Sequence, residues 1–145
     1  MDLLSNETSK IIFIALSALI FMRYLPRIKA KMLGIAFVSI DDVKNRIDSG
    51  EPLLVIDVRS AGEFNGNLGH IPGSLNLDAA QLSDKLSQLS DQLEPYKNDP
   101  IVVTCRTQNR SPGAARILFQ NGFKNLKILN GGLARWNRAE FPVER

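Results

Sequence analysis

The single cysteine of this 145-residue chain lies where a reactive thiol is expected. Cys105 follows the apolar run IVVT at residues 101–104, which is typical of a buried strand. A short loop separates it from a helical pattern that begins near Ser111. Open α/β sheets bind ligands at the carboxyl ends of their strands, and helix N-termini stabilise anions there. Because such surroundings favour a thiolate, we expect Cys105 to be a nucleophile.

The loop that follows Cys105 has no bulky apolar side chain, so its backbone amides are suited to surround an anion. The candidate substrate-binding residues are Arg106, Thr107, Gln108, Asn109 and Arg110. We expect Arg106 to point to solvent and to attract an anionic donor, whereas Arg110 is expected to fold back onto loop carbonyls. Ser111 is predicted to cap the next helix, with Pro112 at its first position.

Strand and helix patterns alternate from residue 35 to residue 145 and define an α/β fold. The predicted strands are residues 35–38, 53–58, 74–77, 101–104 and 127–129. Capping patterns predict helices that start at Ser39, Ser60 and Asp78, and a short helix near the end of the chain carries Trp136. Strands that alternate with helices predict a parallel sheet with helices on both faces.

Two charged residues lie at the C-terminal end of the strand 53–58, near the predicted site. Asp57 and Arg59 are candidates for supporting roles there, and we favour a structural ion pair, with Glu63 or the loop as further partners. His70 is interpreted as a residue that hydrogen-bonds within the fold. Trp136 is interpreted as a core residue.

An apolar segment precedes the domain. Residues 11–22, IIFIALSALIFM, are uncharged. A helix from Thr8 to Leu25 is about 27 Å long, close to the ~30 Å hydrocarbon core of a bilayer. Lys10 and Arg23 lie near its ends, where long side chains reach the interface. We therefore predict one N-terminal transmembrane helix, with residues 1–34 as a membrane anchor and basic juxtamembrane linker and residues 35–145 as the domain.

A signal peptide and a buried core helix are the alternatives for this segment. A signal peptide has a basic start and a small-residue cleavage site, but Asp2 and Glu7 precede the apolar run and RYLPRIKAKM follows it. A core helix does not explain a segment that is apolar on all faces.

The charges around the apolar segment predict its orientation. Lys10 alone precedes it, whereas four cations follow it: Arg23, Arg27, Lys29 and Lys31. The positive-inside rule then predicts a single-pass protein of the inner (plasma) membrane with its domain in the cytoplasm. A lone free cysteine agrees with that reducing compartment.

The composition argues against several functional classes. One cysteine excludes an intramolecular disulfide, and one cysteine with one histidine argues against a zinc site, so no metal or other cofactor is expected. The formal net charge is +3, but residues 1–34 hold five Lys or Arg against two Asp or Glu, and the remainder is neutral. The domain therefore has no predicted nucleic-acid interface.

Five motifs in order resemble the rhodanese domain family. They are LLVIDVRSAGEF, GHIPGSLNL, CRTQNRS, LNGGLARW and FPV. The resemblance covers about residues 35 to 143, and the order and gaps of the five motifs make it specific. It implies a five-stranded parallel sheet flanked by helices, with the active loop after the fourth strand. A membrane helix before a single such domain is similar to a bacterial inner-membrane arrangement.

The resemblance implies that Cys105 carries sulfane sulfur as a persulfide. The chemistry agrees, because a thiolate can attack the outer sulfur of a small anionic donor such as thiosulfate and release sulfite. With one cysteine in the chain, the acceptor must be another molecule, a thiol or protein nucleophile. Many active members carry glycine at the fourth loop position, where this chain has Gln108. Asn109, which tolerates unusual backbone angles, is expected to compensate.

Two other functions stay open. Phosphatases of related fold place Cys and Arg around a phosphate, but their loop is longer than the four residues between Cys105 and Arg110. Tyrosine phosphatases also have His where this chain has Thr104. The other alternative is a membrane-tethered module that binds a partner protein with little catalysis, because a fold does not fix a function.

Overall fold

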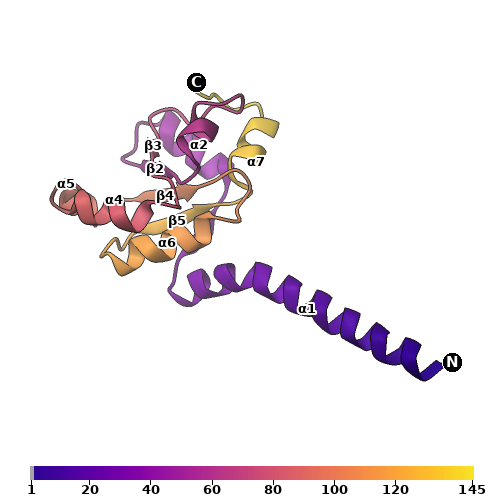
Figure 1. The fold of residues 1–145 in the computed structure, drawn as a ribbon. Coiled ribbons are helices and arrows are strands. Elements are labelled where there is room, and N and C mark those ends of the chain that lie inside the picture. Colours follow the sequence, from indigo (N-terminus) through magenta and orange to yellow (C-terminus); the bar gives the residue numbers. More distant parts are fainter. Residues whose placement is uncertain (1) are drawn as a thin grey trace.

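A long N-terminal helix and an α/β domain make up the computed structural model, which describes residues 2–145, with side chains described from residue 6 onward (Figure 1). In chain order the elements are α1 (Asp2–Met32), β1 (Ala36–Val38), α2 (Ile40–Asp48), β2 (Leu54–Asp57), α3 (Ala61–Phe64), β3 (Leu75–Asn76), α4 (Leu82–Gln88), α5 (Ser90–Leu93), η1 (Glu94–Tyr96), β4 (Ile101–Thr104), α6 (Ser111–Gln120), β5 (Leu126–Leu129) and α7 (Gly132–Arg138). Helix α1 extends away from the domain and carries the N-terminus far from it.

The five strands form one parallel sheet in the order β1-β5-β4-β2-β3, which confirms the predicted fold class. Strand β4 lies at the centre, and all four of its residues are buried. A strand covered on both faces explains the uninterrupted apolar run before Cys105. In the register of β2 and β4, Asp57 lies opposite Thr104, so the ends of these strands meet at one edge of the sheet.

Two hydrophobic cores cover the two faces of the sheet. One includes residues of α4 and α6, with Leu82 and Leu118 fully buried. The other includes residues of α2 and α7, with Val43 and Trp136 buried. Figure 1 shows these helix pairs on opposite sides of the sheet. The interpretation of Trp136 as a core residue is confirmed, and its Nε1–H donates to the carbonyl of Pro142 at 2.9 Å.

Two predicted helix starts are confirmed. The Ser39 side chain accepts from the N–H of Asp42. Ser60 and Glu63 form a reciprocal capping box at α3. Each cap satisfies N–H groups that have no partner inside the helix, which fixes where these two helices begin.

The prediction that Asp78 caps a helix is wrong. Its carboxylate accepts from the N–H of Ala80 in a turn, and α4 begins at Leu82 without a side-chain cap. The predicted single helix is also divided, because Leu89 leaves helical geometry (φ −104°, ψ 12°) between α4 and α5. The leucines of both pieces still face the core, as their spacing predicts.

Helix α1 has two parts in different surroundings. Over Asn6–Met32 it is long and apolar enough to cross a membrane by length and composition, and an 18-residue window within it has a mean hydropathy of 1.8. Its apolar side chains are exposed in this first part, as with Phe13 at 73%. Its last turns pack against α6, where Ala30 is fully buried. The basic stretch after Met22 therefore continues the helix onto the domain.

Candidate active site

Cys105 lies between the central strand β4 and helix α6, as predicted. Its side chain is buried, and its Sγ lies 3.6 Å from Ser111 Oγ, to which the thiol donates a hydrogen bond. The prediction that Ser111 caps α6 is wrong, because Arg110 holds the capping position and Ser111 begins the helix. Ser111 therefore lies one position later in the helix than predicted, and its hydroxyl contacts the sulfur of Cys105 rather than the helix backbone.

Helix α7 orients the first peptides of the active loop. The N–H groups of Leu133 and Ala134 donate to the carbonyls of Cys105 and Arg106 at 2.9 and 2.8 Å. In a trans peptide the carbonyl and the following N–H point in opposite directions, so the N–H groups of Arg106 and Thr107 point away from α7. The loop therefore presents two N–H donors on its other side, as an anion-binding loop requires.

Gly132 allows this close approach, and sequence reasoning did not assign it to the site. A Cβ at Gly132 would lie 2.5 Å from the Cys105 carbonyl oxygen and 2.9 Å from that of Arg106. Gly132 also has a φ of +60°, a left-handed conformation that side chains disfavour. The adjacent pair Gly131-Gly132 before a short helix was the available signal.

Gln108 takes the backbone conformation that favours glycine at the fourth loop position. Its φ is 156°, whereas Asn109 is not among the residues with positive φ, so the expectation that Asn109 compensates is wrong. The Gln108 Oε1 accepts from the N–H of Gly131 at 2.7 Å. This bond ties the middle of the active loop to the start of α7 and offsets part of the backbone strain.

Arg110 closes the loop through Glu63. Its Nη1 and Nη2 lie 2.7 Å from the two Glu63 carboxylate oxygens, a bidentate pair. The expectation that Arg110 binds loop carbonyls is therefore wrong, and Glu63, the capping residue of α3, is its partner. The Arg110 guanidinium, followed by the N–H of Ser60, lowers the pKa of Glu63 to about 2 against the opposing effect of burial. The same hydrogen bonds raise the pKa of Arg110.

Asp57 and Arg59 form a buried ion pair, with Arg59 Nη2 2.7 Å from Asp57 Oδ2. Arg59 also donates to the carbonyls of Glu63 and Gly69 at 3.1 and 2.8 Å. The guanidinium therefore fastens the end of β2 to α3 and to the segment after it. His70 belongs to the same region, where its ring stacks on Phe64 and its Nδ1 lies 3.0 Å from the Phe64 carbonyl oxygen.

A cavity of about 200 Å³ opens beside the loop. Its lining residues are Arg59, Glu63, Gly66, Asn67, Leu68 and Arg106. Arg106 is exposed, as expected, and so are Thr107 and Asn109. The structure thus brings together Cys105, the five loop residues and the Asp57–Arg59 pair. Among the described residues, no three His, Cys, Asp or Glu side chains are grouped to hold a metal, and we assign no metal ligand.

The lowered Glu63 pKa predicts a pH-dependent contribution to stability. Above about pH 4.5 the ionised carboxylate holds Arg110, and this contribution is lost as the pH falls through about 2. The side chains are 39% and 36% exposed, so water screens the pair and we expect about 1 kcal/mol or less. The stability difference between the wild type and Glu63→Gln, from denaturant unfolding, should shrink over this range. Glu51→Gln, at an exposed pair with Arg46, is the control, and an equal slope for both variants would contradict the assignment.

The contact of Gly132 with the loop predicts that substitution of this glycine lowers both stability and activity. Gly132→Ala should displace the Cys105 and Arg106 carbonyls and lower stability by about 2 kcal/mol or more, with at least a tenfold loss of any chemistry at Cys105. Gly50→Ala is a matched control, because Gly50 has a φ of +69° but no atom within 4 Å of an added Cβ. Similar losses for the two variants, in unfolding and in activity, would show that strain alone matters.

Comparison with known proteins places the chain in a family. A family model for the Rhodanese-like domain matches residues 39–139. A thiosulfate sulfurtransferase, GlpE of Pseudomonas savastanoi pv. phaseolicola, is 34% identical over 91 residues, which are 63% of this chain and 77% of that protein. The adenylyltransferase and sulfurtransferase MOCS3-2 of Zea mays is 36% identical over 74% of this chain, which spans about a quarter, 23%, of the length of that relative.

A solved structure has the same fold. The rhodanese-like domain of an Anabaena protein, determined by NMR, superposes with a TM-score of 0.63 at 28% identity, over 74% of this chain and 77% of that one. The two curated relatives, both named as sulfurtransferases, support sulfur transfer in general terms. The family match covers more than half of the chain, and the fold and the cysteine loop agree with it. This protein therefore belongs to the rhodanese-like domain family.

Proposed function

We propose that this protein is a membrane-anchored sulfurtransferase that passes sulfane sulfur from a small anionic donor to a thiol or other nucleophile through a persulfide on Cys105. The observation that carries the proposal is the loop around the thiol. Helix α7 binds the carbonyls of Cys105 and Arg106, so the loop turns N–H donors to its other side. Such preorganised donors stabilise an anion that forms during a reaction.

The reaction takes two displacements at sulfur. The Cys105 thiolate attacks the outer sulfur of thiosulfate, a new S–S bond forms, and sulfite leaves with the electron pair of the bond that breaks. The acceptor, as a thiolate or cyanide, then attacks the outer sulfur of the persulfide and restores the Cys105 thiolate. Cys105 is the only cysteine, so the acceptor is another molecule. No redox partner is needed, because the sulfane sulfur moves without net electron transfer to the protein.

The loop residues have separate roles in this proposal. The backbone N–H groups of Arg106, Thr107, Gln108, Asn109 and Arg110 bind the donor and stabilise the anionic persulfide. The exposed Arg106 guanidinium attracts the anionic donor into the neighbouring cavity. Arg110 acts through Glu63 by holding the end of the loop. Asp57 and Arg59 support the loop from the sheet edge rather than by touching the donor.

A partner-binding module with little catalysis is the second candidate. The observation that favours it is Gln108, since its φ of 156° stores strain where many active members have glycine. The uninterrupted loop and the hydrogen bond that the Cys105 thiol donates to Ser111 Oγ favour catalysis, because they keep the thiol in a polar site. A phosphatase fits less well, because only four residues separate Cys105 from Arg110 and that arginine binds Glu63.

We further propose that residues 1–34 anchor the protein and that residues 35–145 form the rhodanese domain on the cytoplasmic side. Helix α1 has exposed apolar side chains, such as Ile14, which is 66% exposed. In water these side chains would have no apolar surface to pack against. The cations that follow Met22 support a position of the domain on the inner side, by the positive-inside rule.

The persulfide predicts a mass change that depends on one residue. On incubation with thiosulfate, the protein should gain one sulfur atom, and transfer to cyanide should release thiocyanate. Cys105→Ser should abolish both, whereas Ser111→Ala, at the neighbouring hydroxyl, should retain the mass gain. Intact-protein mass spectrometry and thiocyanate release measure these outcomes. A folded wild type that never gains the mass, with thiosulfate or with organic persulfides, would replace this proposal with the binding module.

The charge asymmetry predicts the membrane topology. A reporter that needs the cytoplasm should be active when fused after Arg145, and one that needs export should be inactive. Exchanging the charges, with Arg23, Arg27 and Lys29 changed to Gln and basic residues added before residue 6, should shift the reporters toward the opposite pattern. Recovery of the full-length protein in the soluble fraction would contradict the anchor itself.

A further inference from the structure

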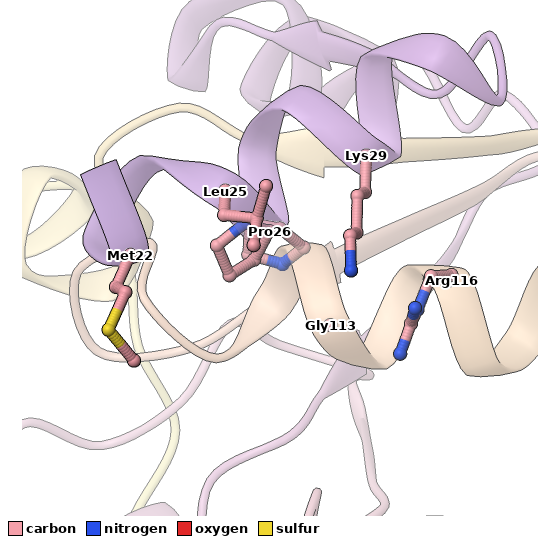
Figure 2. Close-up of a pocket in the computed structure, with 7 residues that line it drawn as sticks. Met22, Leu25, Pro26, Lys29, Gly113 and Arg116 are labelled. Atoms are coloured by element: carbon pink, nitrogen blue, oxygen red, sulfur yellow. The ribbon is translucent and has the colours of Figure 1, made fainter. Parts of the chain in front are cut away.

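A cavity of about 200 Å³ lies between helix α1 and the first turns of α6, away from the cysteine loop (Figure 2). Helix α1 contributes Met22, Leu25, Pro26 and Lys29, and α6 contributes Gly113 and Arg116. The cavity therefore joins the apolar helix to the helix that begins beside Cys105. Nothing in the proposed sulfur transfer uses it.

The cavity has an apolar end and a cationic end. Figure 2 shows Met22 at one end and Lys29 and Arg116 at the other. Among the described side chains, no ion pair includes Lys29 or Arg116. Two cations that border one hollow repel each other, so an anion between them is favoured.

The apolar and cationic ends of the cavity lie at the depths of the acyl chains and headgroups of a bilayer. This comparison rests on the proposal that α1 spans a membrane. Met22 ends the uncharged run, so it lies near the hydrocarbon boundary. Lys29 follows seven residues later, about 10 Å along the helix axis. The headgroup layer is roughly 5–8 Å thick on each side of the hydrocarbon core, so the Lys29 backbone lies just outside this layer. Helical side chains lean toward the helix N-terminus, so the long Lys29 side chain reaches back into it. The cationic end of the cavity then lies at headgroup depth and the apolar end at the level of the acyl chains.

We propose that this cavity binds one anionic phospholipid, with its phosphate between Lys29 and Arg116 and the start of an acyl chain against Met22 and Leu25. Gly113 leaves the room for the headgroup, since an added Cβ there would meet no atom within 4 Å. The occupant is a membrane lipid because only a molecule with both an anionic group and a continuous apolar part matches both ends.

The bound lipid would lie beside the start of the active-site helix. Pro112 also lines the cavity, and the preceding residue, Ser111, faces Cys105 Sγ at 3.6 Å. Figure 2 shows α1 and α6 running in the same direction, from Met22 to Lys29 and from Gly113 to Arg116. The N-terminal end of α6, with the cysteine loop, is therefore its membrane-facing end.

The test measures lipid retention by the full-length protein purified in a mild detergent, with phosphatidylglycerol and phosphatidylcholine as probes and native mass spectrometry as readout. The wild type should retain one phosphatidylglycerol in preference to phosphatidylcholine. Lys29→Gln with Arg116→Gln should lower this preference at least about tenfold, because each cation near an anionic surface contributes roughly fivefold. Gly113→Leu should lower it with all charges present, by filling the cavity.

A matched variant separates the site from general charge attraction. Lys31→Gln with Lys124→Gln removes the same net charge, but neither residue lines the cavity, and the wild-type preference should persist. Equal losses in both double variants would overturn the proposal, as would displacement of the lipid by soluble glycerol phosphate. Transfer of sulfur from thiosulfate, measured on the same samples, reports separately on the proposed function. Persistent transfer with no lipid preference overturns the lipid site alone, whereas a soluble full-length protein overturns the anchor on which it depends.

Discussion

The hydrogen bonds from the first turn of α7 to the carbonyls of Cys105 and Arg106 determine the electrostatics of the active loop. With those carbonyls bound on one side, their negative ends are directed away from the space that the loop surrounds. An anion at Cys105 then meets N–H groups that are already oriented, and no reorganisation is needed when the charge forms. Because the approach requires a residue without a Cβ, Gly132 makes this arrangement possible.

Helix α3 links the remaining supports of the loop. The carbonyl of Glu63 accepts from Arg59, which is held by Asp57, and the carboxylate of the same residue holds Arg110. The two ion pairs differ in surroundings. Asp57 and Arg59 are buried and fully satisfied, so this pair fixes the sheet edge, and removing one partner leaves a charge without compensation. The Glu63–Arg110 pair is partly exposed, so the loop end is held more weakly and responds to pH.

Local patterns in the sequence predict the helices and strands because these elements depend on interactions between residues close in sequence. The apolar run of β4 and the capping box at Ser60 are each complete within a few residues, and both were predicted. The partner of Arg110 was not, because Glu63 lies 47 residues away and spacing carries no information about that contact. The Ser-Pro pair at the start of α6 fits a helix start in two registers that differ by one residue. The local pattern does not show which register places Ser111 against the thiol. Gln108 shows the same limit, since its side chain is satisfied by Gly131 from another loop.

The packing of α1 on α6 connects the N-terminal helix to the helix that begins beside Cys105. Ala30 is fully buried against the domain core, and the carbonyl of the same residue accepts from the N–H of Ile35 at 3.1 Å. These contacts hold the last turn of α1 on the domain. In the proposed anchored protein, α1 would fix the tilt of the sheet relative to the bilayer through its packing on α6, with the Cys105 edge toward the membrane. Under that proposal, an acceptor held at the membrane surface would meet the thiol at a higher effective concentration than one free in solution.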